Sequence, residues 1–285
     1  MSTGNRAVFT ELPFADRQDF DDAMRGFVAT VANSANPQQY QFLAGDAPDT
    51  VNPSLWRLAQ LNALNGLFKV VDGLYQVRGF SLANMTIVEG RTGLIVIDPL
   101  STVASAKEGL DLYFAHRPKR PVVAVVYTHS HSDHYGGVKG VTTDADVRSG
   151  RTKVYAPAGF LDAAVSESVI AGNAMGRRAQ FQFGAPLPRG PQGTVDAGLG
   201  KIDSRGAPGR SLIAPTDSIT LAVDPRTIDG VAITFHLAPA SEAPAEMHLY
   251  FPQLKVLDTA ENATHTLHNL LPLRGTEVRD AKGWS

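Results

Sequence analysis

The stretch "THSHSDHYGG", residues 128–137, holds three of the eight histidines of the chain and one aspartate within six positions. The apolar run that leads into it, "PVVAVVYT", is typical of a buried β-strand. His129 and His131 therefore follow a strand with two-residue spacing, which turns both imidazoles to the same side of extended backbone. Asp133 and His134 come next, before two glycines that allow a tight turn. These four side chains predict half of a two-metal site, whereas the alternative is a polar loop in which Asp133 caps a helix.

The composition limits what could bind there. The chain of 285 residues is 43% hydrophobic and 19% charged, which is ordinary for a globular protein. A formal net charge of -2 gives no general attraction to nucleic acid or to an anionic membrane, so we expect neither as a partner. Because the chain has no cysteine, disulfides and thiolate metal sites are excluded, and a transition metal would be held by imidazole and carboxylate.

The N-terminus shows no targeting segment. Its first twenty residues lack the basic and apolar regions of a secretory signal, and no apolar run approaches the roughly 20 residues of a membrane-spanning helix. We therefore expect a cytoplasmic protein. A periplasmic or secreted protein stays open if a signal has been trimmed from the N-terminus.

The apolar pattern predicts an N-terminal arm over residues 1–60 and a folded domain over residues 61–285. The arm is polar and irregular, apart from a helix predicted over 17–32. The domain begins with β-branched apolar runs that predict strands at 67–79, 85–90, 93–99 and 121–130. A helix predicted over 102–117 separates the last two strands, so we expect a layered α/β sandwich.

The second half of the chain continues this alternation. The pattern predicts a helix over 159–175 and another over 261–271, and it predicts strands at 152–157, 218–223, 231–239, 247–252 and 254–259. Between them, residues 183–210 are dense in Gly and Pro and are too long for an ordinary connection in a compact domain. We expect this segment to be a functional loop or lid.

The stretch 128–137 resembles the H-x-H-x-D-H signature of the metallo-β-lactamase superfamily. The resemblance implies a four-layer αββα fold with a dinuclear zinc site. Asp98, which ends the predicted strand "LIVID", stands where members of that superfamily commonly carry an aspartate. The superfamily includes lactamases, thioesterases, lactonases, ribonucleases and phosphodiesterases, so membership alone does not determine a reaction.

Residues 237–285 narrow the choice, because this segment resembles the alkylsulfatases, whose members hydrolyse alkyl sulfate esters such as dodecyl sulfate. The likeness runs from about residue 60 to the end and is weakest in the Gly/Pro-rich segment. It implies that Glu242 and Glu261 are metal ligands, although by itself a loop glutamate is usually only solvated. The implied zinc ligands are His129, His131 and Glu242 for one ion and Asp133 and His134 for the other, with Glu261 close to both.

The same resemblance implies the groups that handle the sulfate. Asn269, Arg274 and Arg279 stand at sulfate-binding positions of the family, and a guanidinium suits a tetrahedral oxyanion. His268 stands where the family places the group that protonates the ester oxygen. Without the resemblance, the arginines are better interpreted as solvated. His265, four residues after Glu261, is kept as a substitute ligand, and Glu246 is interpreted as structural.

The chain departs from the family pattern at its C-terminus. Family members carry a further histidine ligand, a dimerisation region and a sterol-carrier-like domain after the second glutamate, but this sequence ends 24 residues after Glu261. The resemblance therefore implies an N-terminal catalytic part with an incomplete second zinc site, weak activity and most of the homodimer interface missing. Two other functions stay open: another dinuclear hydrolase, acting on a thioester, lactone or phosphodiester, or a chain that binds zinc or alkyl sulfates without turnover.

Overall fold

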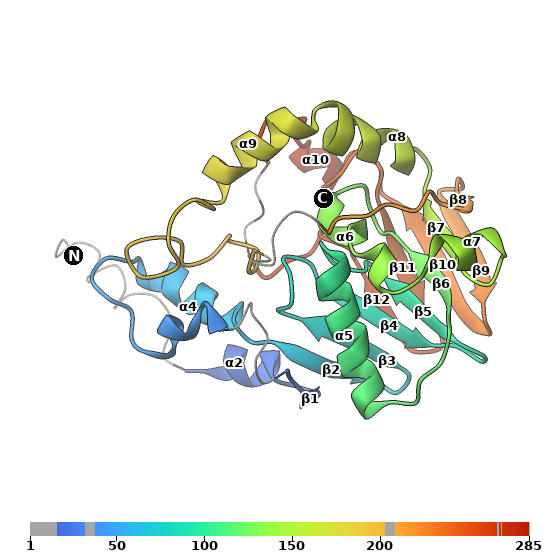
Figure 1. Cartoon of the computed structure of the whole chain (residues 1–285), viewed down its shortest axis with the longest axis horizontal. Helices are drawn as coiled ribbons and strands as arrows, with labels where there is room; N and C mark the ends of the chain where they lie inside the picture. Colours follow the sequence, from blue (N-terminus) through green and yellow to red (C-terminus); the bar gives the residue numbers. More distant parts are fainter. Residues whose placement is uncertain (1–15, 32–37, 203–208, 267, 269, 285) are drawn as a thin grey trace.

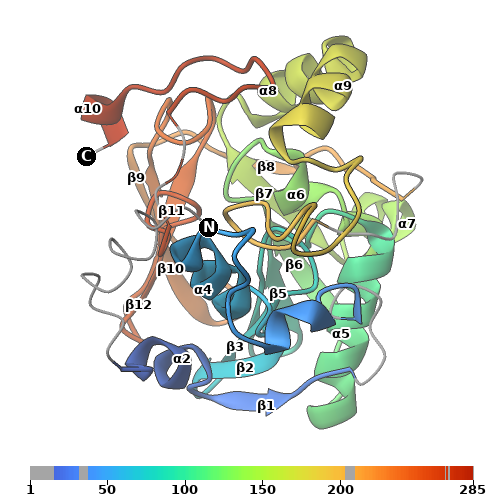
Figure 2. The same ribbon diagram turned by 90° about the vertical axis from the view of Figure 1, so that its left-hand side faces the viewer.

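The computed structural model describes residues 16–31, 38–202, 209–266, 268 and 270–284. Two β-sheets are stacked face to face, and helices cover the outer face of the larger sheet (Figures 1 and 2). In Figure 2 the smaller sheet lies on the left, the larger sheet in the middle and helix α5 (Val103–His116) on the right. The expected α/β sandwich is therefore confirmed.

The larger sheet has eight strands in chain order, from β1 to β8. Strands β1 to β5 pair antiparallel, and β5 to β8 pair parallel. Their bounds are β1 (Phe27–Ala29), β2 (Gly66–Val71), β3 (Leu74–Arg78), β4 (Met85–Glu89), β5 (Leu94–Ile97), β6 (Val122–Val126), β7 (Lys153–Pro157) and β8 (Asp217–Ile219). The parallel half is the part that brings strand ends together at one edge, where the histidine motif begins.

The smaller sheet is an antiparallel meander in the order β12, β11, β10, β9. Its strands are β9 (Val223–Ile228), β10 (Val231–Leu237), β11 (Met247–Phe251) and β12 (Val256–Asp258). One strand had been predicted over 218–223, but β8 ends at Ile219 and β9 begins at Val223, in the other sheet. That prediction was wrong because residues 220–222 carry the chain from one sheet to the other.

Two apolar layers hold the sandwich together. Between the sheets, alternate side chains of β10 and β11 pack against β5 and β6, and the layer includes Ile95, Val126, Phe235 and Leu249. On the outer face, α5 packs its buried Leu110 and Tyr113 on strands β3 to β6. Thr102 and Ser105 form a capping box at the N-terminus of α5. The helix predicted over 102–117 is therefore confirmed.

The predicted helix over 17–32 is wrong. Helix α2 (Gln18–Ala23) ends early, and Gly26, with φ +75°, turns the chain into β1. A Cβ on Gly26 would lie 2.1 Å from the carbonyl oxygen of Lys69 on β2, so only glycine fits this approach. Phe27 then pairs with Phe68, so the second half of the predicted helical face, Phe27 and Val28, belongs to an edge strand.

The helix predicted over 159–175 is longer than expected and interrupted. It consists of α8 (Phe160–Val165), a π-helical turn η3 (Ser166–Ile170) and α9 (Gly172–Gln182). The remaining short helices are η1 (Gln41–Ala44), α4 (Pro53–Leu61), α6 (Ser132–Tyr135), η2 (Val138–Gly140), α7 (Asp144–Arg148) and α10 (Ala281–Trp284). Among the described helices, none has the length and apolar character needed to cross a membrane.

The helix predicted over 261–271 is also wrong for the residues that are described there, which form turns. Tertiary contacts replace helical hydrogen bonds in this segment. The backbone carbonyl of Asn262 accepts from the indole of Trp284 at 3.0 Å, and the Asn262 side chain lies 3.0 Å from the Ser241 hydroxyl. The segment therefore crosses the ends of the strands instead of coiling beside them.

The N-terminal residues pack on the long loop. Tyr40, Leu43, Trp56 and Ala59 form a small apolar cluster with Val195 from the Gly/Pro-rich segment. In Figure 1 the loop after α9 runs across to α4 at the left of the molecule. The described part of the loop has only one isolated β-bridge, between Arg189 and Thr194, and residues 203–208 lie outside the described residues. The division of the chain near residue 60 stays a prediction.

Candidate metal centre

The histidine motif lies where β6 ends, and its imidazoles are removed from solvent. His129, His131 and His134 are 0%, 6% and 4% exposed. His131 is the residue before α6, and Asp133 and His134 lie within that single helical turn. The motif can fold so tightly because Gly137 follows it: a Cβ there would lie 2.0 Å from the carbonyl oxygen of Pro99.

Two glutamates from the smaller sheet complete the cluster. Glu242 is 2% exposed and lies in the turn between β10 and β11, and Glu261 lies shortly after β12. The turn is held by the buried Glu246, whose carboxylate accepts from the Ala243 N–H at 2.8 Å and from the Ser241 hydroxyl at 3.1 Å. Glu246 thus supports the loop that presents Glu242.

The donor atoms form three overlapping groups, each within 4.8 Å. His129, His131, Glu242 and Glu261 make one group, and Asp133, His134 and Glu261 make another. Glu261 belongs to both, in agreement with the arrangement that the resemblance implied. A third group joins Asp98 to His129 and His134. The described groups do not include His265, whose Nε2 instead lies 2.9 Å from the Asn62 side-chain oxygen.

The spacing of these atoms suits ligands of a shared metal ion. His129 Nε2 lies 3.4 Å from both Glu242 Oε2 and Glu261 Oε2, and His134 Nε2 lies 3.4 Å from Glu261 Oε2. Two ligand atoms at about 2.0–2.1 Å from a tetrahedral zinc ion are about 3.3–3.4 Å apart. Within the described residues, His129 Nε2 and His134 Nε2 are buried without a hydrogen-bond partner. Buried polar atoms need a partner, so a metal ion fits this centre.

Asp98 fixes the orientation of His134. It follows β5 with φ 51°, in the left-handed region that non-glycine residues seldom adopt. Its carboxylate accepts from the Thr128 N–H at 2.8 Å and the Thr128 hydroxyl at 2.6 Å, and it lies 2.8 Å from His134 Nδ1. The opposite nitrogen of His134 is left to face Asp133 and Glu261, as expected for a ligand with a carboxylate behind it.

Electrostatics within the cluster separate the charges. Burial lowers the pKa of His134, but the carboxylates of Asp133 and Asp98 raise it to well above the usual value. Burial raises the pKa of Glu261, but His129 and His134 more than offset this and hold it well below the usual range. The metal-free cluster is therefore a set of ionised carboxylates around a protonated imidazole.

The structure brings His268 and Arg279 to the same centre. Arg279 is 8% exposed, donates from Nε to the Glu242 carbonyl oxygen at 2.6 Å and pairs with the Glu242 carboxylate. His268 Nε2 lies 3.3 Å from Glu242 Oε1 and 4.0 Å from Glu261 Oε1. Its ring also lies 5.4 Å from the Trp284 ring of α10, tilted by 57° to it. Asn269, the third predicted sulfate-binding residue, lies outside the described residues.

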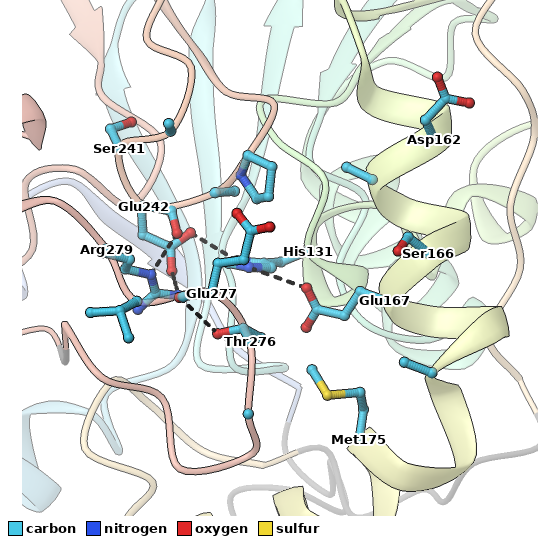
Figure 3. Close-up of a pocket in the computed structure, with 17 residues that line it drawn as sticks. His131, Asp162, Ser166, Glu167, Met175, Ser241, Glu242, Thr276, Glu277 and Arg279 are labelled. Carbon is cyan, nitrogen blue, oxygen red and sulfur yellow. Dashed lines mark hydrogen bonds and ion pairs between the residues drawn. The ribbon is translucent and has the colours of Figure 1, made fainter.

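Arg274 reaches the centre from the opposite side of the cavity. Its Nε donates to Glu167 at 3.1 Å, and its Nη2 lies 3.3 Å from His131 Nε2. Glu167 lies in the π-helical turn η3 and points at His131 in Figure 3. Glu167 was not predicted as a site residue, because a glutamate within a predicted helix carries no local signal of a contact with the histidine motif.

Two cavities meet at the cluster. The larger, of about 720 Å³, is lined by Glu242, Glu261, His268 and both arginines and also by apolar side chains: Leu82, Met175, Phe183, Leu199, Leu271 and Leu273. The smaller, of about 450 Å³, is shown in Figure 3 and is lined by Asp162, Glu167 and Glu277 as well as by His131 and Arg279. The site thus combines metal ligands, fixed cations and an apolar wall.

Known proteins resemble the chain in sequence. Residues 78–234 match the Metallo-beta-lactamase superfamily. An alkyl/aryl-sulfatase of Saccharomyces cerevisiae is 52% identical over 99% of this chain and 45% of its own length. A linear primary-alkylsulfatase of a Pseudomonas species is 50% identical over 99% of this chain and 43% of its own length. The chain therefore spans less than half the length of the curated relatives it matches.

A solved structure resembles it equally well. The stereoselective inverting sec-alkylsulfatase of a Pseudomonas species superimposes with a TM-score of 0.94 and 51% identity, over 98% of this chain and 46% of that chain. The metallo-β-lactamase fold expected from the sequence is therefore confirmed, and an alkylsulfatase shares it.

Proposed function

The chain belongs to the metallo-β-lactamase superfamily, and on that basis we propose that it carries the metal centre of an alkylsulfatase, which hydrolyses alkyl sulfate esters to an alcohol and inorganic sulfate. The observation that supports this function best is the meeting of metal ligands with Arg274, Arg279 and His268 beside one partly apolar cavity. Guanidinium groups bind oxyanions, so two of them at this point favour a substrate with a charged sulfate group over a neutral thioester or lactone.

The metal ligands proposed are the six side chains of the cluster, namely His129, His131, Asp133, His134, Glu242 and Glu261. We propose zinc as the metal, because neutral imidazole and carboxylate ligands without thiolate suit it, as they also suit manganese and iron. A bound zinc ion supplies a water of lowered pKa as nucleophile or base. We propose Glu261, which is shared between the two groups and kept ionised by its lowered pKa, as the catalytic carboxylate that would orient the nucleophile.

The sulfate ester would be oriented by the two arginines. Both guanidinium groups line the large cavity, and their hydrogen bonds to Glu167 and Glu242 hold them in fixed directions. A guanidinium binds two oxygens of a tetrahedral anion at once, so an ester with an anionic sulfate group is favoured over a neutral ester. We propose that Asn269 assists them.

His268 would protonate the leaving oxygen. Its ring lines the cavity beside Glu242, and its Nδ1 lies 2.9 Å from Arg279 Nη1. An imidazole can donate a proton near neutral pH, and the alcohol leaves more easily when its oxygen is protonated. The apolar wall of the cavity, with Leu82, Phe183 and Leu199, would take the alkyl chain.

The test begins with metal content. The chain is loaded with zinc, loosely bound metal is removed, and zinc per folded chain is measured by elemental analysis. Release of inorganic sulfate from dodecyl sulfate is then compared with hydrolysis of dodecyl phosphate and of a carboxylic ester. We expect zinc in the chain and preference for the sulfate ester.

Arg274→Gln should lower kcat/KM for dodecyl sulfate by about 10–100-fold, because one charge-assisted hydrogen bond to the anion is lost. Arg148→Gln, on the exposed helix α7, is the matched control and should leave kcat/KM unchanged. Preference for the phosphate or carboxylic ester would contradict the proposal in favour of another dinuclear hydrolase. Binding of dodecyl sulfate without release of sulfate would contradict turnover.

The cytoplasmic location and a homodimer of the whole protein also stay predictions.

A further inference from the structure

Glu167 occupies an unusual position beside the metal ligands. It lies in η3, the π-helical turn between α8 and α9, and its side chain is 23% exposed. The next residue, Ser168, accepts a hydrogen bond from Tyr135 at 2.9 Å, and Tyr135 ends the helical turn that carries Asp133 and His134. Single π-helical turns within helices are frequent at functional sites. The turn is thus anchored to the histidine motif itself.

The Glu167 carboxylate faces two cationic or titratable groups at once. Oε1 accepts from Arg274 Nε at 3.1 Å, and Oε2 lies 3.8 Å from His131 Nε2. Arg274 Nη2 lies 3.3 Å from the same imidazole nitrogen. Arg274 is further placed by its backbone N–H, which donates to the Gln182 side chain of α9 at 2.7 Å. One carboxylate therefore connects a metal-facing histidine with an arginine of the cavity.

The two nitrogens of His131 have different surroundings. Nδ1 lies 2.8 Å from Glu242 Oε2 within the metal cluster, whereas Nε2 faces Glu167 and Arg274. A neutral imidazole that binds a metal through one nitrogen carries its proton on the other. With Nδ1 used for the metal, Nε2–H becomes a donor and can no longer accept from Arg274. Among the described contacts of this nitrogen, the acceptor is then Glu167. Its Oε2 lies 3.8 Å from Nε2, so the carboxylate or the ring must move closer to form the hydrogen bond.

We propose that Glu167 is a positioning residue that accepts the Nε2–H of His131 to orient it towards the metal and at the same time fixes the Arg274 guanidinium at the cavity. The inference rests on the metal centre of the proposed function, but not on its sulfate ester chemistry. A carboxylate behind a histidine ligand fixes the ring and raises its basicity, and loss of such a partner typically lowers metal affinity 10–100-fold.

The decisive measurement is zinc affinity, by competition with a chromophoric chelator, for the full chain and its variants. Glu167→Gln should weaken zinc binding by about 10–100-fold. Glu167→Asp keeps the charge but withdraws it by one methylene, so it should lie between Glu167→Gln and the unchanged chain. Glu277→Gln is the matched control: it removes one charge from the same small cavity, and among the described contacts its carboxylate reaches neither His131 nor Arg274. Its zinc affinity should change less than about threefold.

A second measurement reports the hydrogen bond directly. In zinc-loaded protein labelled with ¹⁵N-histidine, His131 should show a protonated Nε2 whose proton resonance moves upfield in Glu167→Gln. Circular dichroism verifies that each variant is folded, and if Glu167→Gln does not fold, Glu167→Asp decides by the same criteria. A folded variant with unchanged zinc affinity and an unchanged resonance would overturn the inference alone. A chain that binds no zinc would overturn it together with the metal centre, whereas zinc binding without sulfate release would overturn only the proposed function.

Discussion

Within the cluster, the burial of charge decides how each residue behaves. His134 is 4% exposed and lies between two carboxylates, 2.8 Å from Asp98 and 3.5 Å from Asp133. Its pKa is therefore well above the usual value, even though burial opposes this. A metal ion binds only the neutral ring, so a metal ion and a proton compete for Nε2 of His134. The affinity of the site for a metal ion must therefore depend on pH.

We expect the apparent zinc affinity to rise with pH between 6 and 8, by about tenfold per pH unit for each proton displaced. Asp133 and Glu261, whose pKa values are lowered, are already ionised in this range and release no proton. Isothermal titration calorimetry in buffers of different ionisation enthalpy counts the protons released at pH 7, and we expect about one. The stability of the metal-free chain has the opposite trend. Because the pKa of His134 is raised on folding, its protonation stabilises the fold fully at a pH below the pKa of the unfolded chain, and this contribution is lost as the pH rises through the pKa of the folded chain.

The control for this prediction is Asp98→Asn, which removes one of the two carboxylates beside His134. The ring should then be less often protonated before zinc arrives, so fewer protons should be released at pH 7. A zinc affinity that does not vary between pH 6 and 8 would contradict the protonated state of His134.

At the scale of elements, the site depends on the close approach of two loops. The segment after His134 lies directly against the turn after β5, where a Cβ on Gly137 would come within 2.0 Å of the Pro99 carbonyl and 2.5 Å of the Thr102 carbonyl. Both atoms are backbone, so they cannot move aside as a flexible side chain would. Gly137 thus has no room for a side chain although its φ of -93° is ordinary.

Gly137→Ala should therefore destabilise the fold by about 1–3 kcal/mol, because the two loops must separate. Gly45→Ala is the control, since nothing lies within 4 Å of its added Cβ and its backbone is extended. Urea denaturation with and without zinc measures both. A Gly137→Ala variant as stable as Gly45→Ala would show that the loops are not held at this distance.

Elements also mark the limit of prediction from sequence. Strands β5 to β7 and helix α5 were predicted correctly, because buried β-branched runs and a helical apolar face are local patterns. The helices over 17–32 and 261–271 were wrong, since pairing of Phe27 with β2 and the contact of Trp284 with Asn262 are made by distant residues. The metal motif was visible because its spacing is local, whereas Glu167 and its contact with His131 depend on a helix that folds back over the site.

At the scale of the whole molecule, a buried ion pair within the long loop connects the loop to the N-terminal segment through hydrogen bonds to α4 and to Asn62. Lys201 and Asp196 have side-chain exposures of 3% and 0%. The Lys201 ammonium also donates to the Ala59 carbonyl of α4 at 2.8 Å and lies 4.6 Å from the centre of the Tyr40 ring. Asp196 accepts from Asn62 at 3.0 Å. Because Leu199 and Ile202 of this loop line the large cavity, the pair also holds one wall of that cavity.

Removal of one partner should be costly, because the other charge stays buried. We expect Lys201→Met to destabilise the fold by about 3–5 kcal/mol, and the double change Lys201→Met with Asp196→Asn to recover most of this loss, since no charge is then left unpaired. Lys153→Met is the control: its pair with Asp217 is exposed and should contribute less than about 1 kcal/mol. Urea denaturation measures all three, and limited proteolysis of residues 183–202 measures loosening of the loop. If the double variant is no more stable than Lys201→Met, then the lost stability comes from the ammonium contacts with Ala59 and Tyr40 and not from an unpaired Asp196. The loop would in that case be held to the N-terminal segment by packing rather than by charge.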